Sequence, residues 1–171
     1  MTVRTEETSI QELEPHTWGS GPPLHATFYT SHQLISRIVL RRSEVFSCTI
    51  YGDDLNILEW MEGYLQGKSL PLPLNLSSLS SFTQQGLAAI HSIPFGEVRS
   101  YGEVAKLAGC EKGARAIGNV CNKNPFPLVI PCHRVIQGNG TLGGFAYPLQ
   151  MKQLLLNYES FVPSERKKKS S

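Results

Sequence analysis

A proline-rich stretch near the middle of the chain constrains the possible folds more than any other feature. Residues 68–81 read KSLPLPLNLSSLSS and show no sustained hydrophobic period. Proline lacks a backbone N–H and fixes its own φ, so it interrupts both helices and central strands. We therefore expect a linker between an N-terminal domain at 1–78 and a C-terminal domain at 79–161. The basic residues 162–171 read as a disordered tail.

The two sides of this linker carry opposite charge. Residues 1–92 contain 5 basic and 9 acidic side chains, whereas residues 93–152 contain 7 basic and 3 acidic ones. A positive C-terminal half is consistent with an anionic partner, nucleic acid above all, although solvated charge alone explains many such splits. Charge by itself therefore leaves both readings open.

The chain shows no signal for secretion or for a membrane. No window reaches 18 consecutive apolar residues, and the start MTVRTEETSIQELEP lacks the apolar core of a signal peptide. Its four cysteines form no C-x-x-C pair, which favours free thiols over a disulfide framework. We expect a cytoplasmic protein, nuclear in a eukaryote, with no membrane partner.

The N-terminal domain reads as a small α+β unit. Residues 25–51 are rich in β-branched and aromatic side chains with partial alternation, a pattern typical of a short antiparallel sheet. Asp53 or Asp54 can then cap a helix that ends at Gly67. The inward side chains of this helix, at helical spacing, are Leu55, Leu58, Met61 and Leu65.

The C-terminal domain opens with three predicted helices. The first covers residues 81–93, the second begins with a capping box at Ser100 and Glu103, and the third runs from about residue 114 to 123. Their inward candidates are Phe82, Leu87, Ile90 and Ile93 in the first helix and Val104, Leu107 and Ala108 in the second. The last two helices, joined by a tight glycine-containing turn, outline a helix-turn-helix, although many small domains hold such a corner without touching DNA.

The third of these helices has an unusual exposed face. Arg115 shares it with Asn119 and Asn122, at helical spacing. The side chains around Arg115 are small, namely Ala114, Gly118 and Cys121. A solvated helix more often carries long charged residues, whereas small ones let the backbone lie close to another surface. This face therefore favours contact with DNA.

The run NPFPLVIPCHRV places a cysteine directly before a histidine. Its three prolines bias residues 124–131 towards an extended strand that ends at Cys132. A thiol becomes a good nucleophile when ionised, and its pKa falls beside a histidine that accepts the proton. Adjacent residues of an extended segment point to opposite faces, so a water or a turn must connect Cys132 with His133. A buried, structural cysteine is the alternative.

A third group should orient His133, and we expect Glu159 in this role. The other carboxylates of the C-terminal half are Glu97, Glu103, Glu111 and Glu165. Glu159 ends a predicted final helix that must pack back on the domain. A zinc site is not expected, because the cysteines at 110, 121 and 132 show no metal-ligand spacing, and no cofactor is indicated.

The segments around Cys132 resemble a known family. IPCHRV is preceded by IPFGEVRSYGEVAKLAG and RAIGNVCNKNP and followed by GTLGGF. From about Ile93 to Glu159 the chain is similar to the methylated-DNA protein-cysteine methyltransferases, or O6-alkylguanine-DNA alkyltransferases, which repair guanine alkylated at its exocyclic oxygen. The resemblance implies an α+β fold with a ribonuclease-H-like N-terminal domain and a mostly helical, winged-helix-like C-terminal domain that holds the helix-turn-helix.

The resemblance also implies an activity and its catalytic residues. Cys132 would take a methyl or other alkyl group from O6 of a flipped-out guanine, irreversibly and once per molecule. His133 would draw off the thiol proton through a water, and Glu159 would orient His133. Tyr101 would donate a proton to the departing guanine, and Asn124 would brace the turns around the nucleophile. Whether O4 of thymine also reacts stays open.

The partner that the resemblance implies is double-stranded DNA carrying O6-alkylguanine, bound by a monomer. Arg115 would enter the duplex in place of the damaged nucleotide. The other expected DNA-binding residues are Ala114, Gly118, Asn119, Asn122 and Lys123. The expected substrate pocket consists of Val135, Phe145, Ala146 and Tyr147.

The sequence departs from the family after GG, where it reads FAYPLQMK. Members usually continue with an aromatic residue, a serine and small residues, so Ala146 lacks a hydroxyl that would contact the substrate oxygen. Tyr147 and Pro148 also replace small residues at the pocket rim. The range of accepted alkyl groups is therefore open.

Two other functions compete with this interpretation. The first is a DNA-binding helix-turn-helix protein or an alkylation-damage sensor without efficient transfer; such sensors lack the cysteine that this chain has at Cys132. The second is a cysteine hydrolase, which would turn over many times and would need an oxyanion hole near Cys132.

Overall fold

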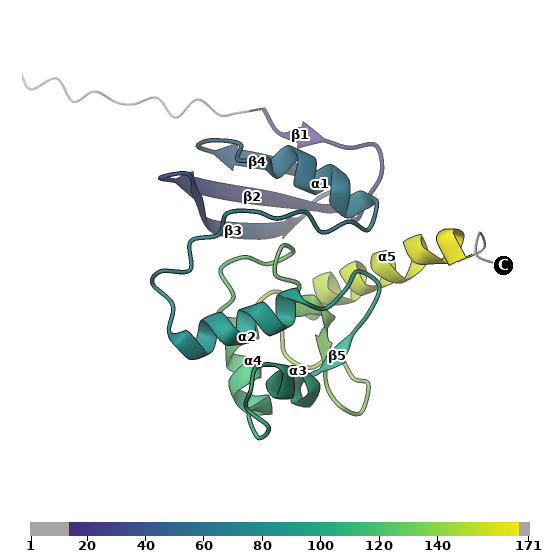
Figure 1. The fold of residues 1–171 in the computed structure, drawn as a ribbon. Coiled ribbons are helices and arrows are strands. Elements are labelled where there is room, and N and C mark those ends of the chain that lie inside the picture. Colours follow the sequence, from purple (N-terminus) through teal and green to yellow (C-terminus); the bar gives the residue numbers. More distant parts are fainter. Residues whose placement is uncertain (1–13, 168–171) are drawn as a thin grey trace, which may run out of the picture.

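The structure is a computed structural model that describes residues 14–167. A four-stranded sheet with one helix lies at one end of the molecule, and a mostly helical body lies at the other (Figure 1). The predicted α+β class is therefore confirmed. The domain boundary at residue 78 stays a prediction.

The N-terminal sheet is mixed, so the prediction of an antiparallel sheet was wrong. Its strands are β1 (His16–Thr17), β2 (Leu24–Ser31), β3 (Leu34–Arg42) and β4 (Ser47–Tyr51), in the order β1-β4-β2-β3. β2 and β3 form a hairpin through His32 and Gln33, both at positive φ, as a two-residue type I′ turn requires. After β3 the chain crosses to the other side of β2 instead of forming a second hairpin, so β4 pairs with β2 in parallel.

Helix α1 (Ile57–Leu65) covers the inner face of this sheet. The Asp54 carboxylate accepts a hydrogen bond from the Leu58 N–H at 3.1 Å, but the helix itself begins after Asn56, which has a φ of 68°. This start differs from the predicted one, and the buried stripe differs with it. The inward side chains are Ile57, Trp60, Met61 and Tyr64, whereas Leu55, Leu58 and Leu65 are half-buried.

The predicted linker is packed against the sheet. The Ile35 N–H donates to the Pro73 carbonyl at 2.7 Å, and the Asn75 N–H donates to the Ile35 carbonyl at 2.9 Å. The leucines that alternate through this stretch are half-buried against the core; they are Leu70, Leu72, Leu74, Leu76 and Leu79. Proline prevented regular structure here, as predicted, but the apolar side chains between the prolines still pack against the core.

The predicted helices of the C-terminal half are confirmed. They are α2 (Ser81–His91), α3 (Tyr101–Leu107) and α4 (Ala114–Asn122), with the short parallel strands β5 (Arg99–Ser100) and β6 (Val135–Ile136) beside them. The capping box of Ser100 and Glu103 is present in α3. Leu107 was placed in the core wrongly, because it is 61% exposed and Ala105 takes the inward position beside Val104.

The last helix, α5 (Leu149–Lys167), is longer than predicted. The sequence suggested an end near Glu159 and a disordered tail over residues 162–171. The charged residues that suggested this tail are also good helix formers, and the helix continues through Lys167. Residues 168–171 lie outside the described part. No helix within residues 14–167 is long and apolar enough to cross a membrane.

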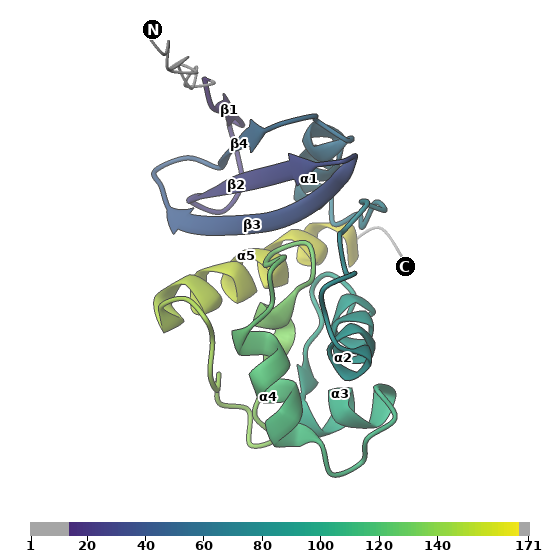
Figure 2. The ribbon, with the colours of Figure 1, turned by 90° about the vertical axis from the view of Figure 1, so that its left-hand side faces the viewer.

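Helix α5 runs along the junction between the sheet and helices α2, α3 and α4 (Figure 2). Three hydrogen bonds cross this junction. The Ile38 N–H donates to the Pro125 carbonyl, the Leu40 N–H donates to the Tyr147 hydroxyl, and the Tyr64 hydroxyl donates to Glu159. The sheet therefore touches the segments that carry the predicted site.

Candidate active site

The segment before Cys132 is a compact series of turns, so the predicted extended strand was wrong. The Asn124 side chain explains the difference: its Oδ1 accepts from the Phe126 N–H and its Nδ2 donates to the Ile130 carbonyl, both at 2.9 Å. Leu128 adopts a φ of 72°, and the Ile130 N–H returns to the Phe126 carbonyl at 2.8 Å. These bonds outweigh the bias of the prolines towards extended backbone.

Cys132 begins a short 3₁₀ turn, Cys132–Arg134, and its side chain is buried at 2% exposure. Burial raises the pKa of the Cys132 thiol, and a hydrogen bond with Asn124 and the charge of Lys152 offset only part of this rise. The expectation that the neighbouring histidine lowers this pKa was wrong, because desolvation of the thiolate dominates. Cys132 is therefore a neutral thiol at neutral pH.

His133 is held by Glu159 from helix α5. The His133 Nε2 lies 2.7 and 3.0 Å from the two carboxylate oxygens. Its Nδ1 is buried and has no hydrogen-bond partner among the described residues. A carboxylate at Nε2 holds the proton on that nitrogen, which leaves Nδ1 as the acceptor. In the turn at residues 132–134, His133 thus has its Nε2 bound by Glu159 and its Nδ1 without a partner among the described residues.

Glu159 is ionised in spite of its burial. Burial by itself would raise the pKa of Glu159, but its interactions with His133 and Arg134 lower it to about 2. Arg134 binds the carboxylate through Nε, and its Nη1 donates to the Ile93 carbonyl at 2.8 Å. Tyr64 of helix α1 donates to the same carboxylate at 3.3 Å. Glu159 is thus the centre of a buried polar cluster.

The sequence did not predict two charged side chains near Cys132 and Glu159, namely Arg134 and Lys152. Arg134 is 7% exposed and Lys152 is fully buried, which is rare for either residue type without partners. The Lys152 ammonium donates to the carbonyls of Val135 at 2.7 Å and Gly144 at 3.2 Å, and to that of Leu142. The position of Arg134 next to Cys132 and His133 was an available signal; for Lys152 the sequence offered none.

The predicted pocket residues lie around this centre. Val135 is fully buried, Phe145 and Tyr147 are half-buried, and Ala146 is exposed. The Tyr101 hydroxyl donates to the Gly144 carbonyl at 2.9 Å. Burial, together with the two nearby thiols Cys121 and Cys132, raises the pKa of Tyr101 to about 12. Tyr101 therefore keeps its proton at neutral pH.

The predicted DNA-binding residues lie on the outer side of helix α4. Exposed side chains there belong to Ala114, Arg115, Asn119, Asn122 and Lys123, with Gly118 half-exposed among them. A Cβ added to Gly118 would meet nothing within 4 Å, so this part of the helix surface is open. The structure thus brings Cys132, His133, Glu159, Asn124 and Tyr101 together in one region and leaves the α4 residues at the surface.

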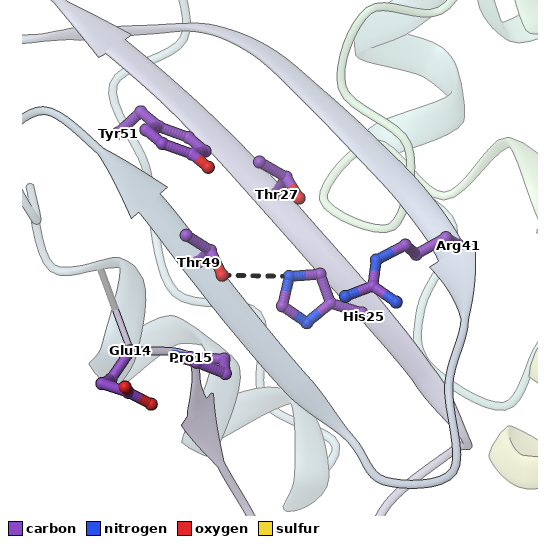
Figure 3. Close-up of a pocket in the computed structure, with 7 residues that line it drawn as sticks. All are labelled: Glu14, Pro15, His25, Thr27, Arg41, Thr49 and Tyr51. Carbon is purple, nitrogen blue, oxygen red and sulfur yellow. Dashed lines mark hydrogen bonds between the residues drawn. The ribbon is translucent and has the colours of Figure 1, made fainter. Parts of the chain in front are cut away.

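A polar hollow on the outer face of the sheet contains none of the predicted residues (Figure 3). Its side chains come from Glu14, Pro15, His25, Thr27, Arg41, Thr49 and Tyr51. His25 is bound on both sides, by the Ser47 hydroxyl at Nδ1 (2.7 Å) and the Thr49 hydroxyl at Nε2 (3.1 Å). Between residues 14 and 167, no three His, Cys, Asp or Glu side chains gather as metal ligands.

Comparisons with known proteins match the part of the chain that contains Cys132. The family described as "6-O-methylguanine DNA methyltransferase, DNA binding domain" matches residues 81–161. A methylated-DNA–protein-cysteine methyltransferase of Methanosarcina acetivorans is 40% identical over 100 residues, which cover 58% of this chain and 64% of that protein. One from Cricetulus griseus is 41% identical over 116 residues, 63% of this chain and 55% of that protein. The chain thus spans less than two thirds of the length of either relative.

Solved structures agree as well. The crystal structure of Mycobacterium tuberculosis OGT in complex with DNA superimposes with a TM-score of 0.62 at 27% identity, over 79% of this chain and 92% of that one. A methyltransferase from Pyrococcus kodakaraensis shares the fold, with a TM-score of 0.61 at 19% identity over 80% of this chain and 98% of that one. Taken together, these matches show that residues 81–161, which carry Cys132, His133 and Glu159, match the DNA binding domain of the 6-O-methylguanine DNA methyltransferase family.

Proposed function

We propose that the chain repairs DNA by moving a methyl or other alkyl group from O6 of guanine to the sulfur of its own Cys132. The observation that carries the proposal is a buried thiol followed by a histidine whose Nε2 is held by an ionised carboxylate and whose Nδ1 has no hydrogen-bond partner within residues 14–167. The match to this family over residues 81–161 supports it, since relatives at about 40% identity bear the name of this activity. Because the alkylated sulfur is not regenerated, each molecule acts once.

The proposed transfer is an in-line displacement in which a bond from sulfur to the alkyl carbon forms while the bond from that carbon to O6 breaks. The thiol proton passes through a water to Nδ1 of His133, and Glu159 stabilises the imidazolium through Nε2. The departing guanine anion takes its proton from the Tyr101 hydroxyl. Water then returns a proton to the tyrosinate, and the His133 imidazolium releases its proton to water, so that the net change is one S–H bond lost and one N–H bond gained. Since burial raises the pKa of Cys132, the thiolate forms only as His133 accepts the proton.

A buried nucleophile requires an extruded base. Cys132 is 2% exposed, so an alkylated guanine must leave the base stack of the duplex, and the residues that bury the thiol must move for the base to reach it. Helix α4, with Arg115 among small neighbours, is suited to enter a groove and fill the gap. A relative of similar structure was solved in complex with DNA, which supports this partner.

The finer descriptions of the fold and assembly are also proposals. We infer a ribonuclease-H-like N-terminal domain over 1–78 and a winged-helix-like C-terminal domain over 79–161, acting as a monomer. A damage sensor without transfer is not favoured, because the chain has Cys132 with its histidine and carboxylate in place. A cysteine hydrolase differs in its stoichiometry, which the following experiment measures.

The test is the intact mass of the full chain after incubation with duplex DNA that contains one O6-methylguanine. We expect one methyl group per molecule, located on Cys132 by peptide mapping, and none after incubation with the unmodified duplex. Cys132→Ser should abolish the adduct and retain DNA binding, whereas Cys110→Ser, at a half-buried cysteine between α3 and α4, should keep it. An adduct on Cys121, or several equivalents of product per molecule, would refute the proposal.

A further inference from the structure

The outer edge of β3 binds segments from three distant parts of the chain. β3 lies at the edge of the sheet, where its outward N–H groups have no strand partner. The N–H groups of Ile35, Ile38 and Leu40 instead donate to the Pro73 carbonyl, the Pro125 carbonyl and the Tyr147 hydroxyl, at 2.7, 2.9 and 3.3 Å. The linker and two segments of the C-terminal half thus dock on one edge.

Two of these docked segments flank the candidate active site. Pro125 follows Asn124, whose side chain builds the turns that lead to Cys132. Tyr147 ends the loop that carries Ala146, the residue expected at the substrate oxygen. Ile38 and Leu40 are two residues apart on β3, so their N–H groups point to the same side of the strand. β3 therefore holds the segments at Pro125 and Tyr147 at a constant separation.

The loop that ends at Tyr147 is held differently at its two ends. Its inner end is bound firmly, since the Gly144 carbonyl accepts from both Lys152 and Tyr101. For residues 145–147, the bond between Tyr147 and Leu40 is the one hydrogen bond within residues 14–167 that reaches another segment. The Phe145 and Tyr147 rings also pack against each other, with centroids 5.8 Å apart. The Tyr147 hydroxyl is thus the polar anchor at the outer end of this loop.

We propose that Tyr147 is a positioning residue, which ties the substrate loop to the edge of the N-terminal sheet and so limits the size of the alkyl group that reaches Cys132. This inference rests on the proposed function and deepens it. Ala146 offers only its backbone N–H to the substrate oxygen, and a donor on an anchored loop is better oriented than one on a mobile loop. The same anchor keeps the loop from moving aside for a bulky group.

Tyr147→Phe tests this role, because it removes the hydroxyl and keeps the ring. The first measurement is hydrogen exchange of the Leu40 amide, which loses its acceptor in the variant; we expect exchange to accelerate about tenfold. The second is the ratio of single-turnover rates on duplexes with O6-benzylguanine and O6-methylguanine, which should rise about 3- to 10-fold if the loop is freed. Tyr51→Phe is the matched control, a half-buried tyrosine on the outer face of the same sheet, and should change neither quantity.

Each outcome decides a separate question. If hydrogen exchange of the Leu40 amide is unchanged in Tyr147→Phe, the hydroxyl does not anchor the loop, whatever the transfer rates are. Faster exchange with an unchanged ratio of rates would overturn the positioning role and leave a purely structural bond. A wild-type chain that transfers neither group would refute the proposed function, and the exchange measurement would then decide the anchor alone.

Discussion

Two buried histidines, one in each half of the molecule, show how similar burial serves different purposes. His25 in the sheet is 3% exposed and His133 beside the nucleophile is fully buried. Both ring nitrogens of His25 meet hydroxyl groups, from Ser47 and Thr49. His133 meets a carboxylate at Nε2 and no described residue at Nδ1. Both ring nitrogens of His25 are thus used within the fold, whereas Nδ1 of His133 has no partner among the described residues and is available to accept a proton.

The charges around the two rings differ in the same way. Burial, and secondly the charge of Arg41, lowers the pKa of His25, so this ring stays neutral between neutral hydroxyls. His133 lies against an ionised carboxylate, which stabilises a positive charge on the ring when one forms. These differences support a structural role for His25 and the acid–base role proposed above for His133.

The largest expected effect comes from replacing each histidine by asparagine. His133→Asn should slow alkyl transfer by about 10²- to 10⁴-fold, because the buried thiol loses the base that accepts its proton. His25→Asn should destabilise the fold by about 1–3 kcal/mol, since buried hydroxyls lose their partner, and should leave the transfer rate of the folded protein unchanged. Single-turnover kinetics and urea unfolding measure the two quantities.

Similar transfer rates for both variants would contradict the assignment of separate roles. So would a variant at His25 that slows transfer while its unfolding free energy equals that of the wild type.

An effect of intermediate size is expected in the acid stability. The pKa of Glu159 falls from 4.5 to about 2 on folding, so the unfolded chain binds its proton first as pH decreases. The ionised carboxylate thus contributes about 3 kcal/mol above pH 4.5, and this contribution is lost between about pH 4.5 and 2. The free energy of unfolding should fall steeply with decreasing pH in this range for the wild type and less steeply for Glu159→Gln.

The His25 ring supplies the contrast in the same titration. Its lowered pKa makes the unfolded chain bind a proton first below pH 6.5, so its contribution is lost at higher pH than that of Glu159. His25→Asn should therefore flatten the curve just below pH 6.5 and leave the part below pH 4.5 unchanged. Flattening of the same part by both variants would contradict the separation of the two clusters.

The smallest expected effect concerns the hydroxyls around His25. Ser47→Ala removes the partner of the His25 Nδ1 and should lower the free energy of unfolding by about 1 kcal/mol. Ser36→Ala removes an exposed hydroxyl that bonds the Tyr29 carbonyl, and should change it by less than about 0.5 kcal/mol. If chemical denaturation gave the same loss of unfolding free energy for both variants, the buried hydrogen bond of His25 would stabilise the fold no more than the exposed one.

Much of the local structure could be predicted because its causes lie within a few residues. The capping box at Ser100 and Glu103 is an interaction over three positions, and it is present. The extended strand before Cys132 failed for a related reason: the prolines were weighed, but the Asn124 side chain, which bonds two and six residues ahead, was not. The parallel pairing of β2 and β4 depends on a crossing of the chain that no local pattern reveals.

The sequence predicted which chemical groups form the candidate site, but only partly how they are buried and which charged groups surround them. Cys132, His133 and Glu159 were identified from residue types and a family resemblance, and the structure brings His133 and Glu159 together. The raised pKa of Cys132 was not foreseen, because desolvation depends on everything packed around the thiol. Lys152 was missed because a lysine in a helix normally faces water, and its burial depends on the carbonyl of Val135 in β6 and on those of Leu142 and Gly144 in the loop before α5.

By itself, the sequence determined which side chains could carry chemistry, where most helices begin and where proline prevents regular structure, since these depend on neighbours along the chain. Only the tertiary structure decided that Tyr64 reaches Glu159 across 95 positions and that Tyr147 reaches Leu40 across 107. Such contacts form when burial of apolar surface brings remote segments together, and their geometry then sets which polar groups are paired, ionised or left free.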